Sequence, residues 1–545
     1  MGKERDSATV IADAKNAIEG AFASLAIFRR ERGQALHHYF AVLEVEQFRA
    51  GGDPILNFGA HRAALESTFH AIPAIMQRCP PVVDGATRIE QTLFEEAREL
   101  FEFSRGLEIV QFNLRLAEKG QFDVFVAKRD PRITFAYASA SASAADTLLR
   151  PYELEERIGL GAGSTFDPKE HLRIIETVKE SLAGRIQRVA QDSIHYEYTP
   201  DLIIGAKQLA QSIMAQKPWD LDPDLPLGSC TVRDLHCFWS AIQALTVVHE
   251  VAHYLAMGRS LHSWPIGSIV QLKSRADWCD IAALLSDLVP GVVGQLLDIY
   301  TYSASVSDKT PALQPFHFVS PDQLGAPSVL IIGTDHERNF LKLLNRHPAL
   351  HSFRDAVNRS KEPLALQQLE GLFPAPRFVT RKQVLIPGLT DADLVVYEHI
   401  TGFVLIVQHK WLIGPDTADE SAANDDELVR GVAQARQSRE YWTQNPVDLR
   451  ARMGLPPDSP LSPIQAVVVS RGAEPTGFVG HTSPPIITEK AFRSLLAKQP
   501  DLPAVWAVLN QRPDHEGAKG RVVDTTNTIE LAGYHFVYPA LGILG

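Results

Sequence analysis

Residues 391–410 read DADLVVYEHITGFVLIVQHK, and they determine the expected fold of the C-terminal part of the chain. Two apolar runs, at 393–397 and 403–407, are rich in valine, leucine and isoleucine. Between them lies the turn His-Ile-Thr-Gly at 399–402. Two such runs on either side of a glycine-containing turn predict an antiparallel β-hairpin.

Further strands and helices are predicted on both sides of this hairpin. Residues 377–386 are strand-like, and residues from about 427 to 442 have helical spacing. A short apolar strand follows at 466–470, and then a strand and a helix at 485–496. This succession is typical of an α/β domain with a mixed sheet. We therefore expect such a domain at 355–500, followed by a β-rich extension at 501–545.

Polar residues stand at the ends of the two hairpin strands. Asp393 begins the first strand, while Gln408 and Lys410 end the second. These ends lie side by side in a hairpin, and residues two apart on a strand point to the same face. An aspartate and an amide oxygen can hold Mg²⁺, and a lysine can orient water or stabilise charge on a phosphate. The alternative is an ordinary hairpin with one exposed lysine and an aspartate at a buried edge.

This order of strand, hairpin, Asp393, Gln408 and Lys410 resembles the PD-(D/E)xK nuclease superfamily, in the glutamine form of archaeal junction resolvases and methyl-directed restriction enzymes. The helix at 431–441 is similar to the one that follows the core hairpin there. The resemblance implies a restriction-endonuclease-like fold, Mg²⁺ and DNA as substrate. It also implies a glutamate from a preceding helix, either Glu362 or Glu370. Because glutamine compensates metal charge less than glutamate does, a domain that binds without cleaving is an alternative.

The first 310 residues have a different spacing of apolar residues. Apolar residues recur at three and four positions in segments such as 13–23 and 88–101, which predicts amphipathic helices. We expect a helical domain at 1–150, a second helical region at 151–310 and a connecting region at 311–354. Within the second region, a long apolar helix is predicted from about 232 to 257 and another from about 277 to 288.

The long helix contains TVVHEVAHYL at 246–255, which includes a His-Glu-x-x-His motif. His249 and His253 are four residues apart, so they share a helix face and can bind one metal ion. Glu250 lies beside that face, where a carboxylate can take a proton from zinc-bound water. The uncharged flanks resemble the zincin metallopeptidases, which implies Zn²⁺ and a peptide or protein substrate. The alternative is a buried helix whose two histidines make hydrogen bonds in the core.

A third metal ligand is harder to place. The metzincin pattern wants a histidine where this chain has Arg259, and no glutamate occurs between residues 254 and 302. If Asp280 matches the aspartate of the gluzincin pattern, the ligand position falls on an alanine. We therefore expect Asp277 as the first candidate and Asp280 as the second, with His262 as a weaker one. A solvated acidic helix face is the alternative.

Composition narrows the classes of function. The chain has 545 residues, of which 45% are hydrophobic and 22% are charged, enough for several domains. Its formal net charge of −12 disfavours a broad basic face, though not a local basic groove. Four scattered cysteines favour a reducing compartment. With neither a signal peptide nor a membrane span predicted, we expect a cytoplasmic protein.

Three hypotheses follow from the sequence. The first is a zinc-dependent metallopeptidase-like hydrolase in which Glu250 activates water held by His249 and His253. The second is a Mg²⁺-dependent DNA endonuclease that uses Asp393, Gln408 and Lys410, with the helical half as a sensor or scaffold. The third is an interaction protein built from two degenerate enzyme folds. The oligomeric state is left open.

Overall fold

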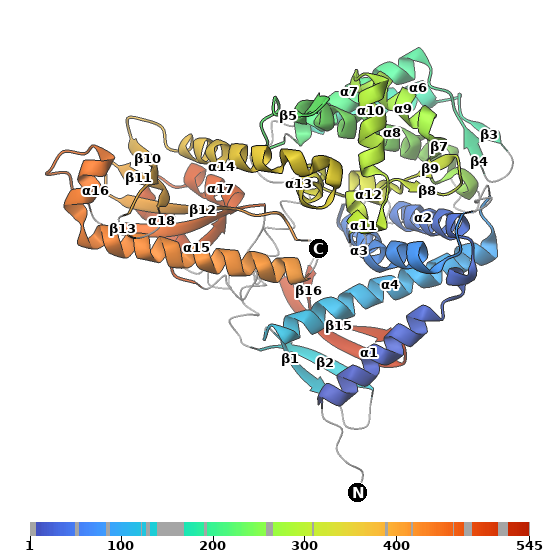
Figure 1. The fold of residues 1–545 in the computed structure, drawn as a ribbon, viewed down its shortest axis with the longest axis horizontal. Coiled ribbons are helices and arrows are strands. Elements are labelled where there is room, and N and C mark those ends of the chain that lie inside the picture. The colour runs from blue at the N-terminus through green and yellow to red at the C-terminus, as the bar shows by residue number, and fades with distance from the viewer. Residues whose placement is uncertain are drawn as a thin grey trace, which may run out of the picture.

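The structure is a computed structural model of the chain. It describes residues 7–49, 54–82, 88–120, 122–126, 131–138, 168–189, 193–217, 219–257, 265–307, 310–386, 388, 391–415, 418–461, 463–472, 482–510 and 522–543. These residues form a helical body and an α/β domain that projects from one side of it (Figure 1). The expected combination of an α-rich part and an α/β part with a mixed sheet is present.

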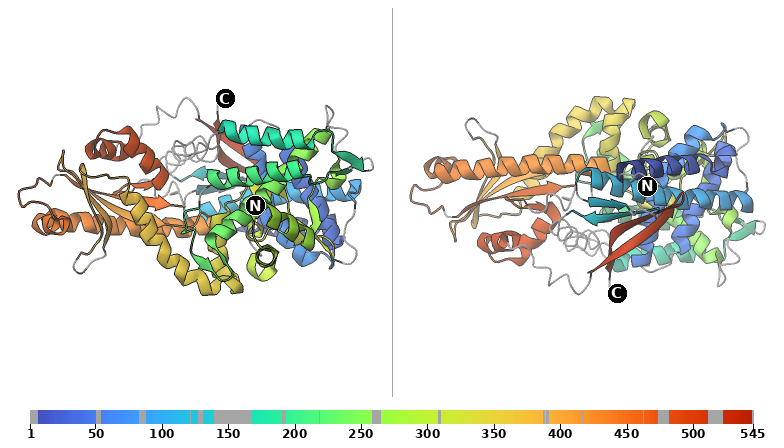
Figure 2. Two further views of the ribbon diagram at one scale, coloured as in Figure 1. Left: turned by 90° about the horizontal axis from the view of Figure 1, so that it is seen from above. Right: turned by 90° about the horizontal axis from the view of Figure 1, so that it is seen from below.

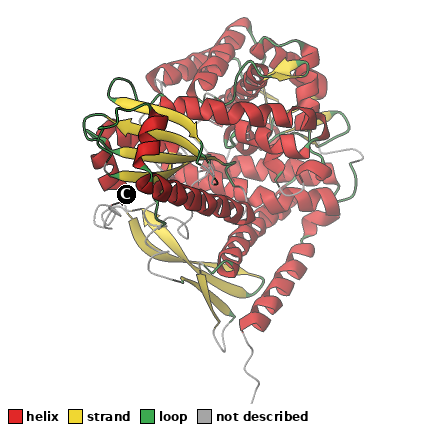
Figure 3. Cartoon of the chain, turned by 60° about the vertical axis from the view of Figure 1, so that its left-hand side comes forward, coloured by secondary structure: helices red, strands yellow, loops and turns green. Residues whose placement is uncertain are grey.

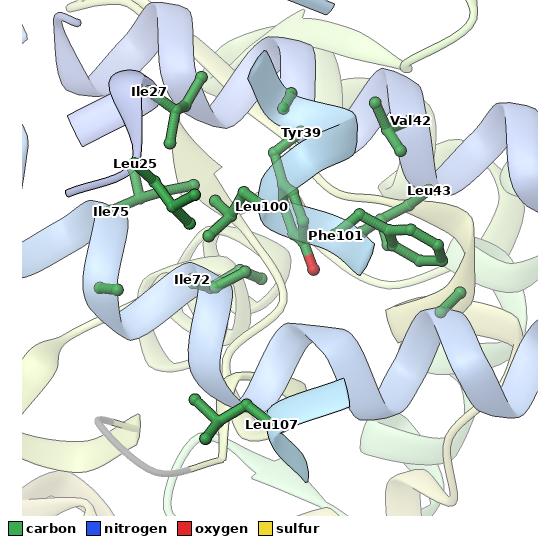
Figure 4. Close-up of a cluster of buried hydrophobic side chains, with 14 of the residues drawn as sticks. Leu25, Ile27, Tyr39, Val42, Leu43, Ile72, Ile75, Leu100, Phe101 and Leu107 are labelled. Carbon is green, nitrogen blue, oxygen red and sulfur yellow. The ribbon is translucent and has the colours of Figure 1, made fainter. Parts of the chain in front are cut away.

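Four long helices build the N-terminal region: α1 (Ser7–Ala23), α2 (Arg32–Arg49), α3 (Pro54–Arg78) and α4 (Gln91–Glu118). Their apolar faces meet in one core, and α2 is buried along most of its length. Figure 4 shows the centre of this core, where Leu25, Tyr39, Ile72 and Leu100 come together. The helical spacing of apolar residues therefore predicts this region correctly.

A four-stranded sheet also belongs to this region, which the expectation of a helical domain at 1–150 did not include. The strands β1 (Phe122–Val126) and β2 (Arg132–Tyr137) form a hairpin. The C-terminal strands β15 (Val522–Leu531) and β16 (Tyr534–Ile543) complete the order β1-β2-β16-β15, with β16 parallel to β2. Figure 3 shows this sheet apart from that of the α/β domain. The chain thus returns to its N-terminal region near its end.

The central region is built around α8 (Val232–Met257), whose bounds agree with the helix predicted from about 232 to 257. Its side chains from Leu235 to Val248 are buried on nearly all sides, as expected of a core helix. Among the described residues, no single helix is long and apolar enough to cross a membrane. Around α8 lie α6 (Pro168–Leu182), α7 (Pro200–Gln216), α9 (Arg275–Ser286) and α10 (Pro290–Tyr300), with the short strands β3 (Gln187–Val189), β4 (Ser193–His195), β5 (Pro226–Leu227), β6 (Cys230–Thr231) and β7 (Leu272–Ser274) and the 3-10 turn η3 (Ile266–Ser268).

The segment 311–354, expected to be a connecting region, is part of this core. It contains β8 (His317–Phe318), β9 (Gln323–Gly325), α12 (Ser328–Ile332) and α13 (His336–Arg346), between the turns η4 (Pro311–Leu313) and η5 (Pro348–Phe353), and it follows α11 (Ala304–Ser307). Phe316 and Phe340 are at most 1% exposed. Because each fully buried apolar side chain contributes about 1.5–3 kcal/mol of transfer free energy, this segment stabilises the central region.

The α/β domain has a five-stranded sheet in the order β10-β11-β12-β13-β14. Its strands are β10 (Phe378–Val384), β11 (Ala392–Glu398), β12 (Val404–Trp411), β13 (Ile464–Arg471) and β14 (Ile486–Thr488). The first three are antiparallel neighbours, whereas β12, β13 and β14 run parallel. The predicted hairpin is therefore confirmed as β11 and β12, and the sheet is mixed.

Helices cover both faces of this sheet, as the views in Figure 2 show. On one face lies α15 (Ala418–Gln444), which connects β12 to the parallel strand β13 and is followed by α16 (Pro446–Met453). On the other lie the end of α14 (Arg354–Glu370), α17 (Glu489–Lys498) and α18 (Leu502–Asn510). The extension expected to be β-rich from 501 thus begins with a helix and continues with β15 and β16.

Candidate functional site

The motif helix α8 brings His249 and His253 together, with ring centroids 4.6 Å apart. Both Nε2 atoms point at the carbonyl oxygen of Ser268, in η3, at 3.0 and 2.8 Å. On its other side, the His249 ring accepts a hydrogen bond at Nδ1 from the Tyr196 hydroxyl at 3.0 Å. The histidines therefore converge on one point, and in this structure a backbone oxygen lies there.

These imidazoles favour the neutral form. Burial lowers the pKa of His253 to about 4, since a buried positive charge loses its hydration. The pKa of His249 also falls well below the usual histidine value, first through burial and then through the neighbouring His253. Neutral imidazoles are the form that metals bind, and they are also the form that donates one hydrogen bond to a core carbonyl.

Glu250 points away from that place, toward a second buried carboxyl group. Ser328, the first residue of α12, donates from its amide and hydroxyl to Glu44 of α2 at 2.6 and 2.5 Å, and it also hydrogen-bonds Glu250. Loss of hydration, and then the charge of Glu44, raise the pKa of Glu250 to about 8. Loss of hydration likewise raises the pKa of Glu44 to about 7.

The two aspartates expected as a third ligand lie at the surface. Asp277 and Asp280 are exposed residues of α9. The Asp277 side chain accepts a hydrogen bond from Ser274, the N-cap of that helix, at 2.7 Å. Within the described ranges, no three His, Cys, Asp or Glu side chains are placed to hold one metal ion. Arg259 and His262 lie outside the described residues. The described part of the chain thus supplies two imidazole donors and an incomplete zinc site.

The hairpin residues of the α/β domain are brought together on one sheet face. Asp393, the second residue of β11, lies beside the end of β12, and its Oδ2 accepts hydrogen bonds from Gln408 Nε2 at 2.6 Å and from the His409 amide at 2.7 Å. Lys410 lies on the face of Gln408, and its ammonium group donates to Gln434 Oε1 of α15 at 2.7 Å. The spacing argument therefore places these three side chains correctly.

Two features of this group fit a divalent cation. Among the described residues, the amide oxygen of Gln408 has no hydrogen-bond partner, and the residue is only 3% exposed. Burial raises the pKa of Asp393 to about 6, although the His409 amide and Lys410 oppose the shift. A buried amide oxygen and a carboxylate in one place are hard oxygen ligands of the kind that Mg²⁺ takes. Because the Gln408 amide lies 2.6 Å from Asp393 Oδ2, these are the two side chains that would hold the ion.

Neither candidate glutamate of the preceding helix is placed at this site by any described contact. Glu362 is exposed on α14. Glu370, at the end of α14, accepts hydrogen bonds from Thr380 at 2.9 Å and forms an ion pair with Lys382 at 2.8 Å. Its contacts are therefore with β10, at the opposite edge of the sheet from β14. The role that the resemblance implies for Glu362 stays a prediction.

The sequence did not single out several residues that the structure places around the hairpin site. Gln434 belongs to a helix that was predicted, but its role depends on how α15 packs. His409 faces the other side of β12, where its Nε2 lies 3.4 Å from Glu489. Burial alone would raise the pKa of Glu489, but His409, Arg471 and Arg493 outweigh it and lower the pKa to about 2. No local sequence pattern predicts such contacts between distant segments.

Comparisons with models of protein families, with curated proteins and with solved structures found no match to this chain.

Proposed function

We propose that the chain is a Mg²⁺-dependent nuclease whose site lies where β11 begins and β12 ends. The observation that carries this proposal is the meeting of Asp393, Gln408 and Lys410 on one face, where the buried Gln408 oxygen has no partner among the residues that the structure describes. A buried amide oxygen left unpaired costs about 1–3 kcal/mol, and a bound cation would offset that cost.

The sheet supports the same assignment. Three antiparallel strands, then a helix that crosses to a parallel fourth strand, are the arrangement expected of a restriction-endonuclease-like core. In such a core the reactive residues lie at the shared ends of the central strands. Here those ends carry Asp393 and Lys410.

Each residue has a distinct part in the proposed reaction. Asp393 and Gln408 would hold the cation through their side-chain oxygens. When bound, Mg²⁺ would neutralise phosphate charge and make a water molecule easier to deprotonate. Lys410, kept in place by Gln434, would donate to the attacking water or to the phosphate oxygen on which charge develops. DNA is the substrate that the resemblance implies.

Cleavage of supercoiled and linear DNA by the full chain in Mg²⁺ tests the proposal. We expect Lys410→Ala and Asp393→Asn to lower the cleavage rate by at least about 100-fold, because each removes a group that acts in the transition state. Lys498→Ala, an exposed lysine at the end of α17, serves as the matched control and should cleave normally. Cleavage that persists in Lys410→Ala would show that the active site lies elsewhere.

A zinc-binding centre on α8 is a second candidate, favoured by the convergence of the His249 and His253 Nε2 atoms on one point. The Ser268 carbonyl oxygen lies 2.8 Å from His253 Nε2, at the point on which the two histidines converge. A zinc ion held at that point would need both histidine nitrogen atoms at about 2.0–2.1 Å. Because the described ligand set is incomplete, we derive no step of peptide hydrolysis from it.

Metal analysis of the purified chain separates this candidate from a helix with core hydrogen bonds alone. One zinc per chain, lost in His253→Ala and kept in the exposed-residue control His351→Ala, would support the centre. Peptide hydrolysis that disappears in Glu250→Gln would extend it to a peptidase. If the chain hydrolyses neither peptides nor DNA, the third hypothesis remains, in which it is a non-catalytic interaction protein.

A further inference from the structure

The carboxylate of Asp393 is held by the backbone of β12 as well as by Gln408. The paired positions of β11 and β12 end at Leu394 and Val407, so His409 lies two residues beyond the last pair. Its amide N–H therefore has no carbonyl partner on β11 and donates to Asp393 Oδ2 at 2.7 Å instead. The position of the His409 backbone thus determines where the Asp393 carboxylate lies.

The backbone at His409 is paired with β13, and the His409 side chain adds a contact on the opposite face of the sheet. It points away from Gln408 and Lys410, and its Nε2 lies 3.4 Å from Glu489 Oε2. Glu489 is the first residue of α17 and is 5% exposed. Arg471 approaches the same carboxylate at 3.2 Å and Arg493 at 2.5 Å. Because a buried carboxylate between two guanidinium groups has little freedom, it gives the His409 ring a fixed neighbour at 3.4 Å.

Arg471 links this carboxylate to the helical body. It ends β13 beside Trp411, with its guanidinium 4.8 Å from the centre of that ring. The same side chain donates to Asp220, in the segment between α7 and β5, at 3.0 Å, and to Gln368 of α14 at 2.6 Å. An unbroken series of contacts therefore runs from the central helical region to the metal-site carboxylate.

We infer that the contacts Asp220–Arg471–Glu489–His409 position Asp393, so that the affinity of the site for Mg²⁺ depends on the docking of the helical body against the α/β domain. This inference rests on the proposed function and assigns Glu489 and Arg471 as positioning residues. It gives the helical half a physical route by which to control the site. Outer contacts of this kind change metal affinity by about 10- to 100-fold in other metal sites.

The first test reads the His409 amide without any metal. In the full chain labelled with ¹⁵N-histidine, the His409 resonance is assigned by its loss in His409→Gln. Glu489→Ala should shift this resonance and make its proton exchange at least about tenfold faster, since the bond to Asp393 weakens. Glu489→Gln keeps an oxygen for His409 and should restore most of the effect. Asp448→Ala breaks a comparable ion pair with Arg452, on α16 of the same domain at 3.1 Å, and should change nothing.

The second test measures Mg²⁺ binding to the same chains by calorimetry. We expect affinity about tenfold weaker in Glu489→Ala and about threefold weaker in Asp220→Ala, a half-exposed residue whose loss the fold tolerates. Unchanged exchange and affinity in a folded Glu489→Ala chain would overturn the inference. If Asp220→Ala alone leaves the Mg²⁺ affinity unchanged, the inferred role of the helical body in positioning Asp393 is wrong. If the unmodified chain binds no Mg²⁺ while its His409 amide responds as expected, the proposed function fails and the positioning contacts stand.

Discussion

Lys410 of β12 donates a hydrogen bond to Gln434 of α15, with 2.7 Å between the ammonium nitrogen and the amide oxygen. This bond ties the long helix on one sheet face to the residue that we assign to phosphate chemistry. It also fixes the direction of a side chain with four rotatable bonds. A lysine held in this way loses little conformational entropy when substrate binds, which favours catalysis.

Gln434→Leu tests this bond directly. The substitution keeps the size of the side chain but removes the acceptor, so Lys410 samples more rotamers. We expect DNA cleavage about tenfold slower at saturating substrate, with a smaller change in KM, because positioning acts mainly on the chemical step. Gln437→Leu, three residues on in the same helix and exposed, is the control. Equal rates for both variants would contradict the assignment.

Glu44 makes stability depend on pH. Its pKa rises from 4.5 unfolded to about 7 folded, so the folded protein holds this proton more tightly than the unfolded chain. The free energy of unfolding should then fall as pH rises from about 4.5 to 7 and stay lower above that. The shift corresponds to at most about 3 kcal/mol.

Glu44→Gln should remove the part of the pH dependence that Glu44 contributes, because glutamine resembles the protonated acid and can still accept from the Ser328 amide, while Glu250, with a pKa of about 8, keeps its own contribution. We expect the variant to be more stable than the unmodified chain at pH 8 and nearly equal to it at pH 5. Urea unfolding at several pH values measures the difference. A variant that is less stable at pH 8 would show that Glu44 is ionised and well stabilised there.

Glu398 holds the hairpin turn to the end of the domain. It is fully buried, and its carboxylate accepts from Arg377 at 2.6 Å, Thr401 at 2.7 Å and the Leu502 amide at 3.0 Å. Glu398→Ala leaves the Leu502 amide without this acceptor, and it removes the carboxylate partner of Arg377, whose side chain is 37% exposed and still donates to the Pro500 carbonyl. We expect a loss of about 1–3 kcal/mol in the free energy of unfolding of the α/β domain, because a buried amide loses its hydrogen-bond acceptor.

The double variant Glu398→Ala with Arg377→Ala separates charge from packing. It also removes the guanidinium that Glu398→Ala leaves without its carboxylate partner, so it should recover part of the stability lost in the single variant. Chemical denaturation followed by tryptophan fluorescence provides the measurement, since Trp442 lies in the core of this domain. A double variant as unstable as the sum of the singles would argue against coupling.

The sequence predicts local elements well, since apolar spacing determines them. The helix at α8 and the hairpin of β11 and β12 follow from periodicity and a glycine turn. The placement of Asp393 opposite the end of β12 follows from hairpin geometry alone. These predictions need only neighbouring residues.

Contacts between distant segments cannot be predicted from the spacing of neighbouring residues. The parallel pairing of β16 with β2 joins residues about 400 positions apart, and the sequence of neither strand predicts which strand it pairs with. The hydrogen bond from Ser328 to Glu44 spans 284 positions. Because Ser328 also contacts Glu250, Glu250 is directed toward Glu44 and away from the two histidines. The extended His-Glu-x-x-His pattern predicts correctly that two imidazoles converge, but it says nothing of the Ser268 carbonyl between them. The peptidase reading of this motif stays a prediction.

Gly431 of α15 offers a test in which stability and activity separate. A Cβ atom there would lie 3.0 Å from Lys410 Cε and 3.3 Å from Val468 Cγ1, so the lysine must shift. Alanine is preferred over glycine inside a helix by about 1 kcal/mol, and the end of a lysine moves easily. We therefore expect Gly431→Ala to keep or raise the thermal midpoint while slowing DNA cleavage by about tenfold.

Gly431→Ser, similar in size to alanine but a poorer helix former, should slow cleavage as much and lower the midpoint. Val429→Ala on the exposed side of α15 should leave cleavage unchanged, which excludes a general effect of mutating the helix. A Gly431→Ala chain that cleaves at the normal rate would mean that Lys410 acts from a different rotamer. The contact with Gln434 would then be structural, and the lysine would reach the phosphate without it.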